Sequence, residues 1–179
     1  MYKIATFLVS HFWGKPSEMA DALGVLLLTW NNALYRYGIF DFSALETALR
    51  QNMNGLKAYR DRDILSFTDA DDKPVDALFN SFLDALKIAG GKSKGTRSPV
   101  AVAKALHLLA PAFFPLWDDK IATGYHCHYS GNPSAKYLAF VRISKNMAEE
   151  IKGLVETGGT TLLKMIDEYN YAKFTKKWI

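Results

Sequence analysis

The chain has 179 residues, of which 49% are hydrophobic and 22% charged, and its formal net charge is +4. This composition is typical of a folded globular domain and excludes an intrinsically disordered chain. Its longest apolar run, residues 22–30, is shorter than the ~20 residues that a transmembrane helix needs, so we expect no membrane partner.

Apolar residues recur at spacings of three and four along most of the chain, which predicts a mainly α fold. We expect one compact helical domain over residues 1–179, or two small helical lobes that share a core. The expected helices and short helical elements cover residues 19–37, 41–51, 56–65, 74–89, 98–109, 118–125, 136–155 and 160–173. The first of these is apolar nearly all round and should lie in the middle of the core.

Little in the sequence indicates export or a cofactor. The N-terminal stretch lacks the pattern of a secretory signal, and the single cysteine, Cys127, cannot form an intramolecular disulfide. His126 and His128 flank Cys127, but no further ligand completes a tetrahedral metal set. We therefore expect a cytoplasmic monomer without metal or other cofactor.

Two helix starts are marked by capping residues. Ser98 followed by Pro99 predicts one, and Asp118 or Asp119 predicts the other. The adjacent carboxylates leave a question open, because a capping aspartate is usually structural, whereas a fixed carboxylate can also work as an acid or a base.

Basic residues form two clusters in the sequence. Lys92, Lys94 and Arg97 lie in a glycine-bearing loop before Ser98, and a second cluster comprises Lys173, Lys176 and Lys177. Either cluster fits a nucleic-acid surface or a solvated segment. Because free N–H groups at a helix start bind phosphate, the loop over residues 91–98 is a candidate phosphate cradle.

The order of this loop, a helix, an apolar connection and an Asp-led helix resembles that of helix-hairpin-helix DNA glycosylases. "VAVAKALHLL" at residues 100–109 is similar to the second hairpin helix, and "PLWDDKI" at residues 115–121 is similar to the V-D-T-H-V motif, with Asp118 as the family's aspartate. "LLLTWNNALYR" at residues 26–36 is similar to an early helix of the 8-oxoguanine branch, whose asparagine enters the DNA stack. The resemblance predicts a hairpin-like element at about residues 84–125.

This resemblance implies an enzyme that hydrolyses the N-glycosidic bond of a damaged or modified base, flipped out of double-stranded DNA, in DNA repair or anti-phage defence. Asp118 would stabilise the sugar cation or activate water. Lys104 is a second catalytic candidate, but neither it nor Lys94 matches the position of the family's catalytic lysine, so we expect a water-using, monofunctional enzyme.

Further residues are assigned to DNA contact and to the base pocket. The candidates for DNA contact are Asn31, Asn32, Lys92, Lys94, Arg97, Ser98 and Lys120. The candidates for the base pocket are Trp30, Tyr35 and Trp117. The alternative interpretation is a non-catalytic helical module that binds nucleic acid or a protein partner, with Asp118 and Asp119 acting only as caps.

Overall fold

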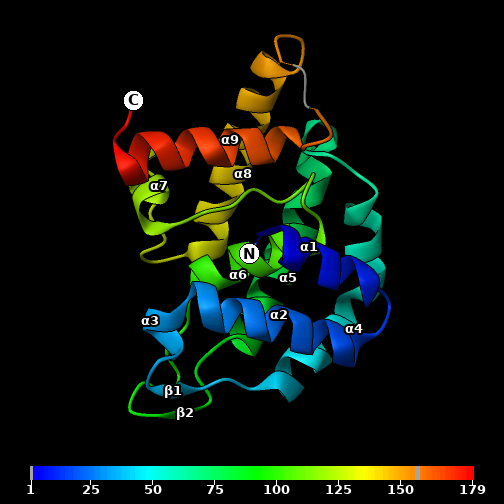
Figure 1. Cartoon of the computed structure of the whole chain (residues 1–179), viewed down its shortest axis with the longest axis vertical. Helices are drawn as coiled ribbons and strands as arrows, with labels where there is room; N and C mark the ends of the chain where they lie inside the picture. The colour runs from blue at the N-terminus through cyan, green and yellow to red at the C-terminus, as the bar shows by residue number, and fades with distance from the viewer. Residues whose placement is uncertain (1, 156–157) are drawn as a thin grey trace.

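The computed structural model describes residues 2–155 and 158–179, and helices dominate them (Figure 1), which confirms the predicted mainly α fold. The helices are α1 (Tyr2–His11), α2 (Pro16–Trp30), α3 (Asn32–Tyr35), α4 (Phe42–Arg60), α5 (Asp72–Ala85), α6 (Pro99–Leu109), α7 (Asp119–Gly124), α8 (Pro133–Ile151) and α9 (Leu162–Asn170). The shorter elements are the 3₁₀ turns η1 (Ile64–Ser66) and η2 (Asp69–Asp71), the π-helical turn η3 (Tyr171–Lys176) and the strands β1 (Gly38–Ile39) and β2 (Gly90–Gly91).

Two differences from the predicted elements lie in the N-terminal part. The prediction missed α1, which buries Ala5 and Val9 against the core. It also ran one helix from residue 19 to 37, whereas α2 ends at Trp30 and α3 follows. Asn31 leaves the helical backbone conformation, with φ −117° and ψ 34°, because the end of α2 is held by a side chain from α6, described below.

Two further helices are longer than predicted. The prediction ended a helix near residue 51, but α4 continues through Gly55 to Arg60. A glycine inside a helix costs ~1 kcal/mol, and burial of Leu56 and Tyr59 outweighs this cost. Similarly, α8 begins at Pro133 rather than at residue 136, because Asn132 accepts a hydrogen bond from the amide of Ala135 and caps the helix.

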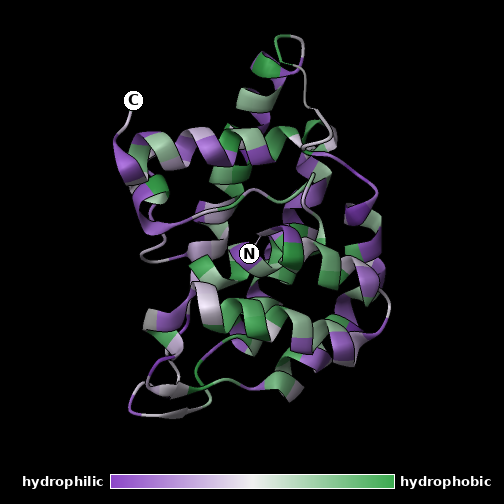
Figure 2. Cartoon of the chain, in the orientation of Figure 1, coloured by the Kyte–Doolittle hydropathy of each residue, from purple (hydrophilic) through white to green (hydrophobic). Residues whose placement is uncertain are grey.

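The centre of the fold is α6, which contacts α1, α2, α5 and α8. Eight of its eleven residues are buried, and the adjacent α2 is hydrophobic along its middle (Figure 2). One continuous hydrophobic core includes residues from Ala5 to Ile166. Lys104 interrupts the buried run of α6, and it is only partly buried.

The connection from α5 to α6 crosses to the edge of the molecule, where β2 pairs antiparallel with β1. Gly91 has φ +84°, and a Cβ there would lie 2.7 Å from the carbonyl oxygen of Tyr37, so this position requires glycine. The loop closes further on, where Ile88 N donates to Thr96 O at 2.9 Å. The segment predicted as hairpin-like therefore comprises the end of α5, this closed loop, α6 and α7.

Within residues 2–155 and 158–179, no helix combines the length and the apolar character that crossing a bilayer requires.

Candidate functional site

A cavity of about 300 Å³ opens between α1, α2, α6, α9 and the start of α7. These elements lie around one region in Figure 1, where the turn η3, which follows α9, lies beside α7. The cavity is lined by four aromatic side chains, Tyr2, Trp30, Trp117 and Tyr171, and by four charged ones, Lys104, Asp118, Lys164 and Asp167. It therefore combines flat apolar surfaces with charges of both signs.

Asp118 is the N-cap of α7. Its Oδ1 accepts a hydrogen bond from the amide of Ile121 at 2.8 Å, and its Oδ2 accepts a longer one, 3.4 Å, from Thr175 Oγ1. Asp119 does not line the cavity, because its side chain is 66% exposed and accepts hydrogen bonds from His128 and Tyr129. The structure thus separates the two adjacent carboxylates, and Asp118 is the one at the cavity.

Lys104 reaches the same cavity from α6. Its Nζ donates to the carbonyl oxygen of Trp30 at 3.1 Å and to Oδ1 of Asn31 at 2.7 Å. A cation is favourable at a helix C-terminus, so Lys104 holds the end of α2 and explains the break at Asn31. Burial lowers the pKa of Lys104, and the negative charges of Asp118 and Asp167 oppose this shift.

An ion pair on α9 also lines the cavity, where Lys164 Nζ is 2.7 Å from Oδ2 of Asp167. Burial lowers the pKa of Lys164, but the hydrogen bond and the charge of Asp167 outweigh burial, so that its pKa lies above the usual value. Lys164 Nζ also lies 4.9 Å from the ring centroid of Tyr2. Lys164 therefore stays protonated, and the carboxylate of Asp167 balances its charge. Lys104 has no such carboxylate bonded to it, because its Nζ donates to a carbonyl oxygen and a side-chain amide oxygen.

The aromatic wall is fixed from behind by a buried histidine. Tyr2 and Trp30 have parallel rings with centroids 6.4 Å apart. His107 is fully buried, and its Nδ1 lies 2.7 Å from the carbonyl oxygen of Phe114, which can only accept. Nδ1 therefore carries the proton, and Nε2 accepts from the hydroxyl of Tyr2 at 2.8 Å. Burial lowers the pKa of His107 to about 4, which keeps the ring neutral at pH 7.

Four of the residues singled out in the sequence meet at this cavity, namely Trp30, Lys104, Trp117 and Asp118. A fifth, Asn31, is hydrogen-bonded to Lys104. Lys120 lies near the cavity, because its Nζ donates to the carbonyl oxygen of Thr175 at 3.4 Å and the hydroxyl of Thr175 donates to Asp118. These residues come from three separate segments of the chain that the fold brings together.

The remaining predicted residues lie elsewhere. Tyr35 is buried in the core, where its hydroxyl donates to the carbonyl oxygen of Leu86, and it does not line the cavity. Asn32 is exposed at the start of α3. The basic loop is also exposed: Lys92 and Lys94 point from its turn, Arg97 pairs with Asp84 at 2.5 Å, and Ser98 caps α6 by accepting from the amide of Ala101.

Sequence reasoning missed Tyr2, Lys164, Asp167 and Tyr171. Tyr2 belongs to the helix that was not predicted. Lys164 and Asp167 are three residues apart on an amphipathic helix, a spacing that is common to many solvent-exposed ion pairs. No local signal distinguishes such a pair from one that lines a cavity.

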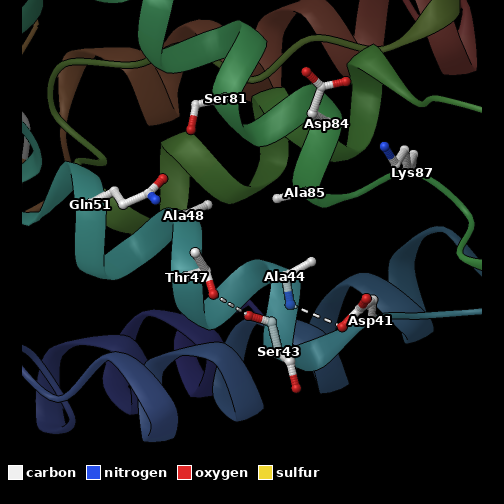
Figure 3. A pocket seen from close by; sticks show the side chains of 10 residues that line it. All are labelled: Asp41, Ser43, Ala44, Thr47, Ala48, Gln51, Ser81, Asp84, Ala85 and Lys87. Atoms are coloured by element: carbon white, nitrogen blue, oxygen red, sulfur yellow. Dashed lines mark hydrogen bonds between the residues drawn. The ribbon is translucent and has the colours of Figure 1, made fainter.

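A wider hollow of about 610 Å³ lies between α4 and α5 (Figure 3). Its carboxylates are already engaged: Asp41 accepts from the amide of Ala44 as the cap of α4, and Asp84 pairs with Arg97. Figure 3 shows mostly short side chains around it, such as Ser43, Thr47 and Ser81. We therefore assign the candidate site to the smaller cavity at Asp118.

Among residues 2–155 and 158–179, no group of three or more His, Cys, Asp or Glu side chains is arranged to hold a metal ion. No protein-family model, curated protein or solved structure matches the chain. The site is therefore interpreted from its own geometry.

Proposed function

We propose that this protein is a DNA glycosylase that hydrolyses the N-glycosidic bond of a damaged or modified base. The observation that carries the proposal is that Asp118 and Lys104, chosen from different segments, line one cavity with aromatic walls. Its volume lies at the lower end of the ~300–1,000 Å³ typical of ligand pockets, which suits a single flipped base.

In the proposed reaction the bond between C1′ and the base nitrogen breaks, and its electron pair leaves with the base. Positive charge develops on the sugar, and the carboxylate of Asp118 stabilises it. A water oxygen then bonds to C1′ and gives up a proton, which Asp118 accepts. The sugar keeps the hydroxyl group, the base gains a proton from Lys104, and the proton held by Asp118 returns to Lys104 through solvent, so that one water is divided between the two products.

Lys104 fits the leaving-group side of this reaction. Its ammonium has three N–H donors, of which two bind Trp30 O and Asn31 Oδ1. The third is available to donate to the base as negative charge builds up on it. Trp30 and Tyr2 would supply faces on which the flipped base stacks.

DNA outside the cavity would be held by the loop over residues 91–98, whose exposed Lys92 and Lys94 can contact phosphates. The side-chain nitrogen Nδ2 of Asn31 is buried and has no hydrogen-bond partner within residues 2–155 and 158–179. A buried donor without a partner costs free energy, so a bound base or sugar oxygen is a fitting acceptor for it.

A second candidate activity adds strand cleavage to base removal. The lowered pKa of Lys104 increases the fraction of its neutral amine, which is a nucleophile. Its neutral Nζ would bond to C1′ while the base leaves with the electron pair of the C1′–N bond. Loss of a proton from Nζ and opening of the C1′–O4′ bond would give the Schiff base, and elimination of the 3′-phosphate would then cleave the strand. We favour the water-using reaction because Trp30 O and Asn31 Oδ1 hold Nζ in its protonated, donating form.

Abasic-site formation tests the proposal. Wild type is incubated with duplexes that each carry one damaged or phage-type modified base, and alkali-labile sites are counted. In Asp118→Asn the rate should fall by roughly 100- to 1,000-fold, because the charge is lost while asparagine keeps the helix cap. Asp41→Asn is the matched control, since Asp41 caps α4 through the amide of Ala44 at 2.9 Å and should leave the rate unchanged.

Three outcomes would redirect the proposal. If wild type binds DNA but gives no product on any duplex, the non-catalytic module is the correct interpretation. Equal rates in wild type and Asp118→Asn would leave an enzyme but remove Asp118 from its chemistry. A protein–DNA adduct trapped by borohydride would establish the Schiff-base reaction.

A further inference from the structure

The second basic cluster of the sequence, which fits a nucleic-acid surface or a solvated segment, lies next to the cavity. Exposed aromatic residues flank its three lysines. We call it the lysine–aromatic surface, and it comprises Tyr169, Tyr171, Lys173, Lys176, Lys177 and Trp178. Its rings are accessible, with 42% of Tyr169, 42% of Tyr171 and 72% of Trp178 exposed.

The lysines of this surface lie against its rings rather than against carboxylates. Lys173 Nζ donates to the hydroxyl of Tyr169 at 3.1 Å and lies 5.4 Å from the ring centroid of Phe174, and Lys176 Nζ is 5.6 Å from the ring centroid of Tyr171 and 5.9 Å from that of Trp178. In the described part of the chain none of the three lysines forms an ion pair. Their positive charge is therefore available to an anionic partner.

The segment is ordered by its contacts with α7. Phe174 packs on Gly124 so closely that a Cβ on this glycine would lie 2.3 Å from the ring. The carbonyl oxygen of Thr175 accepts from Lys120, and its hydroxyl donates to Asp118. Trp178 N donates to Ala172 O at 3.0 Å, so the exposed indole is attached to hydrogen-bonded backbone.

Tyr171 connects the surface to the candidate site, because it belongs to the surface and also lines the cavity. In Figure 1 the C-terminal end of this segment lies beside α7, whose first turn is capped by Asp118. A chain that leaves the cavity on this side would run directly over the lysines and rings.

We propose that the lysine–aromatic surface binds single-stranded nucleic acid next to the cavity. Charged grooves with accessible aromatic faces bind single strands because every unstacked base can stack on a ring, whereas bases inside a duplex cannot. The inference rests on the proposed function in one respect. In a glycosylase, the surface would bind the single-stranded segment that forms when a base is flipped out of the duplex. Tryptophan, tyrosine and lysine also suit a membrane interface, which the test below separates.

The test uses fluorescence anisotropy with the full chain and an undamaged labelled oligonucleotide, single-stranded and as duplex. Wild type should bind the single strand more tightly than the duplex. The triple variant Lys173→Gln/Lys176→Gln/Lys177→Gln should bind the single strand at least tenfold more weakly, and its salt slope should fall by about 2, since each phosphate contact contributes ~0.7. The triple variant Lys15→Gln/Lys57→Gln/Lys152→Gln removes the same charge from exposed positions elsewhere and should bind as wild type does.

Stacking is tested separately by Trp178→Ala, which should weaken single-strand binding roughly tenfold and leave the salt slope unchanged. Several results would overturn the inference: equal losses in the two triple variants, tighter binding to the duplex, no binding to either DNA, or binding to anionic phosphatidylserine vesicles in place of the strand. Because the DNA is undamaged, these results do not depend on catalysis. A failure of the glycosylase assay therefore leaves this measurement interpretable.

Discussion

The starts of α6 and α7 are alike in local chemistry and different in surroundings. Ser98 and Asp118 each cap their helix, accepting from the amide of Ala101 at 3.1 Å and of Ile121 at 2.8 Å. A cluster of lysines lies close to each start, in the loop before Ser98 and in the segment packed on α7. In the sequence each lysine cluster fits a nucleic-acid surface, but only the fold brings the second cluster close to the start of α7.

The surroundings separate them. Beside Ser98 the chain is solvent-exposed, and Arg97 is already paired with Asp84. Beside Asp118 lies a cavity, with the partly buried ammonium of Lys104 in its wall. A capping residue by itself therefore does not distinguish a catalytic site from a purely structural helix start. A cavity in which the cap faces a side chain of opposite charge is a better indication of a catalytic site. Four substitutions test this contrast.

Lys104→Met should have the largest effect. Product formation at saturating DNA should fall roughly 1,000-fold, the range expected when a positioned proton donor is lost. Trp30 O and Asn31 Oδ1 also lose their donor, at a cost of about 1–3 kcal/mol of stability. Lys94→Met, in the loop before α6, should keep the saturating rate; equal losses in both variants would abolish the contrast between the two helix starts.

The pH dependence of stability tests the buried histidine that joins α6 to the connection before Asp118. The pKa of His107 is about 4 in the folded protein, below its usual 6.5. As pH falls below 6.5 the unfolded chain binds this proton and the folded one does not, so stability is lost down to about pH 4. The loss should reach about 3 kcal/mol in urea unfolding.

His107→Gln should remove this part of the pH dependence, measured as the difference in unfolding free energy between pH 7 and pH 4.5. If His107→Gln leaves the pH dependence of the unfolding free energy unchanged, another group is responsible for it.

Gly124→Ala probes the contact between α7 and the segment that follows α9. Its Cβ would lie 2.3 Å from the ring of Phe174, which must move and shift Thr175 away from Asp118. We expect a loss of ~1–3 kcal/mol and roughly tenfold slower product formation. Gly55→Ala, inside α4 with no atom within 4 Å of its Cβ, should instead stabilise the protein by ~0.5–1 kcal/mol and leave the rate unchanged.

Ser98→Ala should have the smallest effect. Loss of the cap costs about 1 kcal/mol, visible as a lower melting temperature, but the rate at saturating DNA should stay that of wild type. A slower saturating rate would mean that the start of α6 takes part in the reaction, contrary to the comparison.

The sequence by itself determined the mainly α fold and the starts of α6 and α7, the latter to within one residue. These depend on local interactions, because a cap and its amide are three residues apart and helical periodicity repeats every turn. Local patterns failed where a distant residue intervenes. The break at Asn31 follows from Lys104, 73 residues away in the chain.

Only the tertiary structure decided which candidates share a site. Tyr35 and Tyr2 are both aromatic residues on N-terminal helices, yet Tyr35 is enclosed in the core and Tyr2 faces the cavity. Similarly, Asp118 lines the cavity, whereas the adjacent Asp119 points to solvent. Which face of a helix is covered depends on the helices packed against it, and these come from segments that a local pattern does not connect.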